Sequence, residues 1–197
     1  FILVCPNGDG GWFSNSHDGR HRYEDWIAGD LPREIETLFR VRPGAGSRGI
    51  AGISMGGYGA VKIALRHPEL YGSVSGLSAA VIPMGWDDVG KLFFLARRQL
   101  HSVFGASRDD NSLAENDVWQ IVTSRDRWSV PFEVYLLAGT EDKYRLDHVA
   151  AQYADFLNRK GIRATARLEP GVHDWPYWSD SMLEIARWHA ARFVAAH

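Results

Sequence analysis

Short apolar runs alternate with stretches of helical periodicity along this chain. The apolar runs predict strands over residues 1–5, 48–53, 72–77, 132–138 and 164–168. Apolar positions at helical spacing predict helices over residues 23–39, 147–160 and 179–194, and a further helix that follows residue 54 and stops before Pro68. This alternation is the signature of an α/β fold, so we expect a mostly parallel sheet of about five strands with helices on both faces.

Residues 79–130 do not follow this alternation, because they contain no strand pattern. Residues 89–104 and 113–122 have helical character, and the polar stretch 107–111 separates them as a turn. We therefore predict a helical insertion over residues 79–130 that forms one wall of a pocket. With 197 residues, of which 45% are hydrophobic, the whole chain is expected to be a single domain.

The centre of the pattern is Gly52-Ile53-Ser54-Met55-Gly56, a G-x-S-x-G sequence between a predicted strand and a predicted helix. This context is typical of a nucleophile elbow, a turn so tight that its flanking positions must be glycine. Such a turn raises the serine hydroxyl above the positive end of the following helix. The alternative is a glycine-rich turn in which Ser54 only caps the helix.

Charge and cysteine content limit the other functional classes. The formal net charge is −2 and no basic run occurs, so neither nucleic acid nor an anionic membrane surface is an expected partner. No cluster of His or Asp has metal-ligand spacing, so neither a metal nor another cofactor is expected. The single cysteine, Cys5, cannot form an internal disulfide and is expected as a buried thiol in the first strand.

No stretch of the chain is long and apolar enough to predict a membrane span. The chain begins at Phe1, inside a predicted strand, and we expect residues of the protein to precede it. The sequence assigns neither a compartment nor an oligomeric state.

A serine hydroxyl attacks an acyl carbon only when a base accepts its proton and a third group orients that base. In doubly wound hydrolases these partners follow the serine in the order acid, then histidine. Asp142 and His173 obey this order, and each lies just beyond the carboxyl end of a predicted strand. Their competitors are solvated or structural residues, namely Glu141 and Asp147 for the acid and His17, His21, His67, His148 and His189 for the base.

The oxyanion of an acyl transfer needs two backbone N–H donors. Met55, the residue after the predicted nucleophile, is expected to provide the first. The second belongs to the loop after the third strand of such sheets, which we expect to precede Phe1.

Several segments together carry a resemblance to a known family. They are Pro6–Gly8 through Trp12, residues 23–27 with 30–32, residues 52–59, residues 139–142, and Gly171-Val172-His173-Asp174-Trp175 with Trp178. In these the chain resembles the "putative esterase" branch of the α/β-hydrolases, which includes tributyrin esterases, S-formylglutathione hydrolase, feruloyl esterases and mycolyltransferases. The resemblance implies an α/β-hydrolase fold in which Ser54 is the nucleophile, Asp142 the acid, His173 the base and Met55 an oxyanion donor. Family members begin with further strands, so we expect this chain to lack the N-terminal part of the fold.

The resulting hypothesis is a serine esterase that hydrolyses small-molecule carboxylic esters through an acyl-enzyme. Two alternatives stay open: acyl transfer to another acceptor by the same three residues, and a hydrolase-like domain that binds without turnover. Trp12 is a candidate substrate-binding residue at the edge of the acyl pocket, with plain core packing as the alternative. Trp175 and Trp178 are expected to support the His173 loop rather than to touch substrate.

Overall fold

The computed structural model describes residues 1–84, 94–105 and 112–193. Four parallel strands form one sheet in the order β1 (Gly49–Ile53), β2 (Ser73–Leu77), β3 (Glu133–Gly139) and β4 (Ala164–Glu169). In this register Ile50 pairs with Val74, Val74 with Val134, and Val134 with Ala164. Since all four strands run the same way, their carboxyl ends meet at one edge of the sheet, where Ser54 follows β1.

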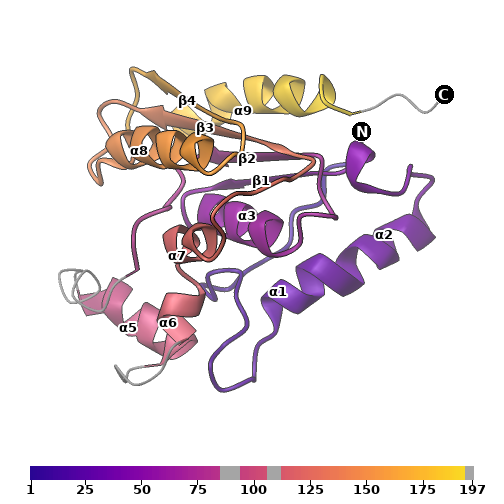
Figure 1. The fold of residues 1–197 in the computed structure, drawn as a ribbon, viewed down its shortest axis with the longest axis horizontal. Coiled ribbons are helices and arrows are strands. Elements are labelled where there is room, and N and C mark those ends of the chain that lie inside the picture. Colours follow the sequence, from indigo (N-terminus) through magenta and orange to yellow (C-terminus); the bar gives the residue numbers. More distant parts are fainter. Residues whose placement is uncertain (85–93, 106–111, 194–197) are drawn as a thin grey trace.

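Helices cover both faces of this sheet, as predicted (Figure 1). Helices α3 (Met55–Arg66) and α8 (Leu146–Arg159) lie on one face, and α9 (Trp175–Ala190) lies on the other. Successive residues of a strand point to opposite faces. Thus Val134 and Leu136 join the larger core with α3 and α8, whereas Tyr135 and Leu137 pack with Trp178 of α9 in a smaller one.

The helical segment before the sheet contains a wider turn. It consists of α1 (Tyr23–Asp25), a π-helical turn η1 (Trp26–Asp30) and α2 (Leu31–Leu38), within the predicted span 23–39. Asp30, which precedes α2, makes no side-chain cap hydrogen bond. Pro32 has no N–H to donate, so the helix continues only because the turn before it widens, with the N–H of Leu31 donating to the carbonyl of Trp26.

The described residues of the expected insertion include helices and no strand, whereas residues 79–84 and 124–130 are not helical. The helices of this region are α5 (Phe94–Phe104), α6 (Ser112–Glu115) and α7 (Val118–Thr123). Outside this region, a short 3₁₀ turn η2 (Ala45–Ser47) precedes β1. The predicted turn at 107–111 and the start of the predicted helix at 89 lie outside the described residues. The role of residues 79–130 as a pocket wall stays a prediction.

The predicted first strand is wrong. Residues 1–8 form no strand, the side chains of Phe1 and Leu3 are 77% and 68% exposed, and Cys5 is an exposed rather than a buried thiol. The sheet of the described residues therefore has four strands instead of about five. An apolar run is equally compatible with an extended segment along an apolar surface, and residues 1–6 line a large cavity beside β1.

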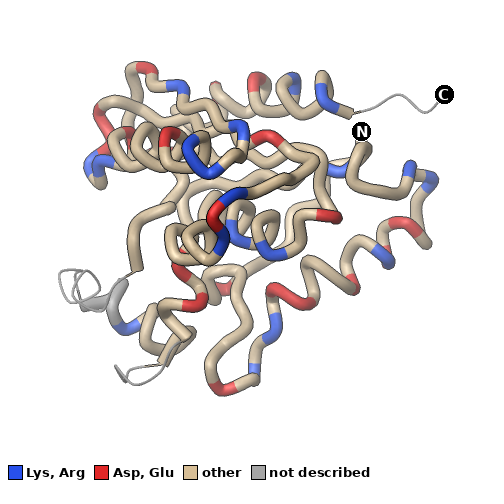
Figure 2. The backbone as a smooth tube through the Cα atoms, viewed as in Figure 1, with Lys and Arg blue, Asp and Glu red and all other residues tan. Residues whose placement is uncertain are grey.

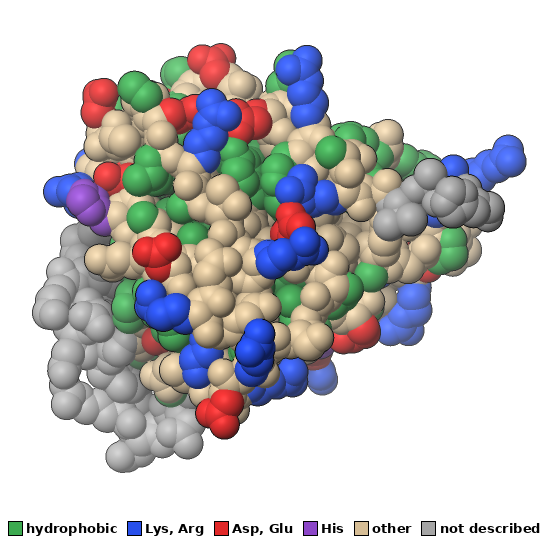
Figure 3. Space-filling model, turned by 45° about the horizontal axis from the view of Figure 1, so that its top comes forward, with side chains coloured by type: hydrophobic (Ala, Val, Ile, Leu, Met, Phe, Trp, Pro, Cys, Tyr) green, Lys and Arg blue, Asp and Glu red, His purple; other side chains and the backbone are tan. Residues whose placement is uncertain are grey.

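Basic and acidic positions are scattered along the backbone (Figure 2), and side chains of both signs are interspersed on the face shown in Figure 3. Within the described residues, no helix combines the length and the hydropathy that a membrane crossing requires. That part of the chain also contains no group of His, Cys, Asp and Glu able to hold a metal ion. The absence of nucleic acid as a partner stays a prediction.

Candidate active site

Ser54 lies in a sharp turn between β1 and α3. Its backbone has φ 51° and ψ −113°, a conformation that is costly for a residue with a side chain. The turn is held from both sides, because the N–H of Ser54 donates to the carbonyl of Leu77 (2.9 Å) and its carbonyl accepts from the N–H of Ala80 (3.0 Å). The strained turn predicted from the G-x-S-x-G sequence is therefore present.

The glycines around Ser54 are required by close backbone contacts. A Cβ atom at Gly52 would lie 2.1 Å from the carbonyl carbon and oxygen of Gly56. A Cβ atom at Gly57 would lie 2.7 Å from the Cβ atom of Ala79. Since neither neighbour is a flexible side-chain end, any larger residue would force the helix away from the strand.

The side chain of His173 reaches Ser54 from the loop after β4. Its Nε2 atom lies 3.1 Å from the Ser54 Oγ atom, and its Nδ1 atom lies 2.7 Å from the Asp142 Oδ2 atom. An ionised carboxylate can only accept, so Nδ1 carries the proton and the Nε2 lone pair faces the hydroxyl. This tautomer is the one that can take a proton from Ser54.

Asp142 lies in the loop after β3 and is 1% exposed. Its Oδ1 atom accepts a hydrogen bond from the N–H of Tyr144 (2.8 Å), so both carboxylate oxygens have a donor. The loops of Asp142 and His173 are joined by the N–H of Glu141, which donates to the carbonyl of Gly171 (2.9 Å). This bond fixes the spacing between the two side chains.

Two aromatic rings hold the imidazole edge-on. Tyr144 and Trp178 each place a ring 4.9 Å from His173, at interplanar angles of 86° and 85°. The indole N–H of Trp178 donates to the Ser78 Oγ atom (3.2 Å). Trp178 thus supports the imidazole, as the sequence indicated, while Tyr144 was missed. The signal for Tyr144 was its place two residues after Asp142, where an Asx turn brings it back toward the carboxylate.

The other carboxylates and histidines have different surroundings. Glu141 is exposed, and Asp147 pairs with Arg145 and His148. Among the described histidines, His173 is the one with a hydrogen bond to Ser54. His189 lies on α9, and its two ring nitrogens form hydrogen bonds with the hydroxyls of Ser73 and Ser75. Burial, with a smaller contribution from Arg192, lowers the pKa of His189 to about 4.

Ser54 opens into a cavity of about 1150 Å³ beside β1. Its wall is mostly apolar and includes residues 1–6, Leu31 and Ile35 of α2, and the exposed Trp175 of α9. Phe13 lines this cavity. Its neighbour Trp12 is 9% exposed and packs edge-on against Tyr58 (5.3 Å) in the core. Substrate binding by Trp12 stays a prediction.

The positive end of α3 lies at the hydroxyl of Ser54. Met55 is the first residue of this helix, and the first N–H groups of a helix have no acceptor within it. Stabilisation of the oxyanion by the N–H of Met55 stays a prediction.

Comparison with known proteins places the chain in a family. The family described as "Putative esterase" matches residues 1–189. This chain belongs to that family.

The esterase-family chain is 21% identical to an acetyl esterase of Caldicellulosiruptor saccharolyticus over 94% of its own length and 70% of that protein. It is 30% identical to an S-formylglutathione hydrolase of Paracoccus denitrificans over 85% of its length and 55% of that relative. The structure of an S-formylglutathione hydrolase from Agrobacterium tumefaciens superposes with a TM-score of 0.75 at 23% identity, covering 93% of this chain and 64% of that one. The chain has the α/β-hydrolase fold. It spans only part of the length of these relatives.

Proposed function

We propose that this chain is a serine hydrolase of carboxylic esters that works through an acyl-enzyme. One observation carries the proposal: a continuous line of hydrogen bonds from the Ser54 Oγ atom through both ring nitrogens of His173 to Asp142. Family membership supports the proposal, as do relatives that are named acetyl esterase and S-formylglutathione hydrolase.

In the first step the Ser54 Oγ atom attacks the ester carbonyl carbon while the Nε2 atom of His173 takes its proton. The carbonyl oxygen becomes an oxyanion, which the N–H of Met55 and the positive end of α3 stabilise. Asp142 accepts the Nδ1–H hydrogen bond throughout, which holds the ring and stabilises the imidazolium.

Collapse of the tetrahedral intermediate breaks the bond to the alcohol oxygen, which leaves with the proton from Nε2. The acyl group is then bound to Ser54. A water molecule gives a proton to Nε2, attacks the acyl carbon and releases the carboxylic acid, and Ser54 regains its proton. No metal or organic cofactor takes part in this scheme.

A fluorophosphonate probe followed by peptide mass spectrometry tests the nucleophile. We expect modification of Ser54 and its absence in Ser54→Ala. The variant His173→Gln should label slowly, whereas His21→Gln, which changes an exposed histidine in the first loop, should label at the wild-type rate. Modification at another residue, or equal labelling of His173→Gln and His21→Gln, would contradict the proposed scheme.

Turnover of a short-chain p-nitrophenyl ester tests the reaction. Release of the acid by the wild type and loss of release in Ser54→Ala are expected. A folded wild-type protein that neither turns over the ester nor labels at Ser54 would instead support a binding domain. Accumulation of a transferred ester when an alcohol acceptor is added would support the acyltransferase alternative.

A further inference from the structure

The loop before α1 brings an aromatic ring to the cavity that contains Ser54. The ring of Phe13 packs over three glycines: a Cβ atom at Gly8 or at Gly59 would lie 2.7 Å from Phe13, and one at Gly56 would lie 3.6 Å from it. Gly56 and Gly59 belong to the first turns of α3, directly after the nucleophile. Phe13 therefore forms the part of the cavity wall next to Ser54.

The backbone that carries Phe13 is strained. Trp12 and Phe13 have φ angles of 53° and 49°, so two consecutive bulky residues lie in the left-handed region. Such a conformation persists only when the surrounding structure holds it. Here the contacts of the neighbouring residue Ser14 hold the strained backbone.

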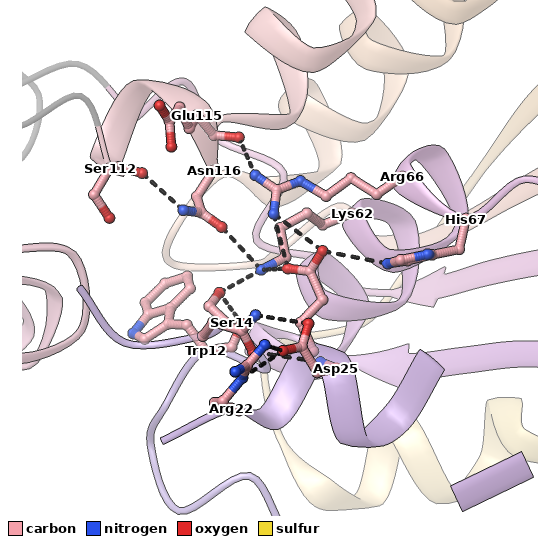
Figure 4. A network of polar contacts seen from close by, with 12 residues as sticks. Trp12, Ser14, Arg22, Asp25, Lys62, Arg66, His67, Ser112, Glu115 and Asn116 are labelled. Atoms are coloured by element: carbon pink, nitrogen blue, oxygen red, sulfur yellow. Dashed lines mark hydrogen bonds and ion pairs between the residues drawn. The ribbon is translucent and has the colours of Figure 1, made fainter. Parts of the chain in front are cut away.

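A buried lysine supplies that support (Figure 4). The Nζ atom of Lys62, on α3, donates to the Ser14 Oγ atom (2.5 Å), and Ser14 Oγ donates onward to the carbonyl of Trp12 (2.9 Å). The side chain of Lys62 is fully buried and Ser14 is 0% exposed. The short chain of bonds thus runs from the nucleophile helix to the strained peptide itself.

The lysine is itself fixed in place, since each of its three N–H groups has an acceptor. Besides Ser14 these are the Glu24 Oε2 atom (2.8 Å) and the Asn116 Oδ1 atom (3.1 Å). Arg66 binds the same carboxylate at 3.0 Å. Burial lowers the pKa of Lys62 and the Glu24 carboxylate partly opposes this; the resulting pKa of about 8 leaves the ammonium mostly charged at pH 7.

We propose that Lys62 and Ser14 are positioning residues that hold Phe13 against α3 and thereby set which acyl chains fit beside Ser54. The inference rests on the proposed esterase function. The apolar cavity is suited to bind an acyl chain, and Phe13 forms the wall of this cavity next to Ser54. Neither Lys62 nor Ser14 touches the reacting atoms, so both act through the ring.

The variant Ser14→Ala breaks the link while the pair of Lys62 and Glu24 remains. We expect the ratio of kcat/KM for p-nitrophenyl octanoate and acetate to change by about tenfold, mainly through KM, because a pocket contact of one or a few methylenes is worth that much. Labelling of Ser54 by a small fluorophosphonate should stay at the wild-type rate.

Ser73→Ala is the matched control, because Ser73 is also 0% exposed and its hydroxyl bonds to His189 on the other face of the sheet. It should leave the acyl-chain ratio within about twofold of the wild type. An equal change of the ratio in both variants would overturn the proposal, as would an unchanged ratio in Ser14→Ala.

A double variant tests whether Ser14 acts through the ring. Phe13→Ala should change the ratio, and adding Ser14→Ala to it should change the ratio no further, since the two act on one contact. Additive changes would overturn the inference.

Hydrogen exchange of residues 8–16 separates the two proposals. Faster exchange in Ser14→Ala, with wild-type exchange in Ser73→Ala, is expected even if the protein turns over no ester. Absence of turnover and of Ser54 labelling in the wild type would count against the proposed function alone. Unchanged exchange in Ser14→Ala would count against the positioning role alone.

Discussion

His189 provides the sharpest test of the packing between the sheet and α9. Its Nδ1 atom lies 2.7 Å from the Ser73 Oγ atom and its Nε2 atom 2.8 Å from the Ser75 Oγ atom, so the neutral ring has a partner on each nitrogen. Burial, helped by Arg192, lowers the pKa from 6.5 to about 4. The unfolded chain therefore takes up a proton on this residue at a higher pH than the folded protein does.

Because the pKa of His189 is lower in the folded protein than in the unfolded chain, acid lowers the free energy of unfolding. Above pH 6.5 the residue is neutral in both states, and the full stability is present. As the pH falls from 6.5 toward about 4, only the unfolded state is protonated, so stability is lost across this interval. A tenfold change in proton affinity corresponds to about 1.4 kcal/mol, which makes the loss about 2 kcal/mol at pH 5 and about 3 kcal/mol at pH 4.

Urea unfolding of the wild type and of His189→Gln between pH 7 and pH 4 measures this loss. Other groups titrate equally in both proteins, so the difference between their free energies of unfolding isolates His189. The variant is expected to be less stable than the wild type at pH 7. The difference between their free energies of unfolding is expected to shrink by about 2 kcal/mol between pH 7 and pH 5. His21→Gln, at an exposed position, should follow the wild type. A difference between wild type and His189→Gln that is constant with pH would refute the reasoning.

Two further predictions concern the site. Gly52→Ala would place a Cβ atom 2.1 Å from the backbone of Gly56, so we expect a loss of about 3 kcal/mol or more in the free energy of unfolding. Gly29→Ala meets only the flexible end of Arg33 and is the control; equal urea midpoints for the two variants would contradict the close-contact argument. Asp142→Asn should lower kcat about ten-thousandfold with KM nearly unchanged, because the neutral amide does not stabilise an imidazolium and its N–H₂ group can donate to Nδ1, which puts the ring proton on Nε2 facing Ser54. Steady-state kinetics that show less than a tenfold loss would argue against Asp142 as the orienting acid.

The local sequence pattern was sufficient to locate the helices and strands whose periodicity and end residues are clear in the sequence. The strands β1 to β4 and the helix α8 lie within a residue or two of their predicted spans, because strand and helix periods and the stop at Gly161 are local properties. The apolar spacing predicts a start of α9 at residue 179, but the helix begins at Trp175. Asp174 caps it through the N–H of Tyr177 (3.0 Å), and Pro176 lies in its first turn, where the sequence favoured a loop.

Chain order and strand ends were also enough to select Ser54, Asp142 and His173, which the structure brings together. Parallel strands place their carboxyl ends at one edge whatever the details of packing, so residues that follow these ends must meet there. Tyr144 and Phe13 could not be selected in this way. Their contacts with His173 and with the glycines of α3 depend on how a loop folds back onto the sheet, which no local pattern contains.

The sequence by itself determined the four strands β1 to β4, the order of the site residues and the need for glycine around Ser54, because these follow from periodicity, topology and backbone sterics. Only the tertiary structure decided that residues 1–5 line a cavity instead of forming a strand, and that Lys62 bonds to the Ser14 loop. The physical reason is that pairing and burial depend on partners distant along the chain. A run of apolar residues carries no information about which of those partners is present, and a lysine in a helix carries none about the carboxylate it will meet.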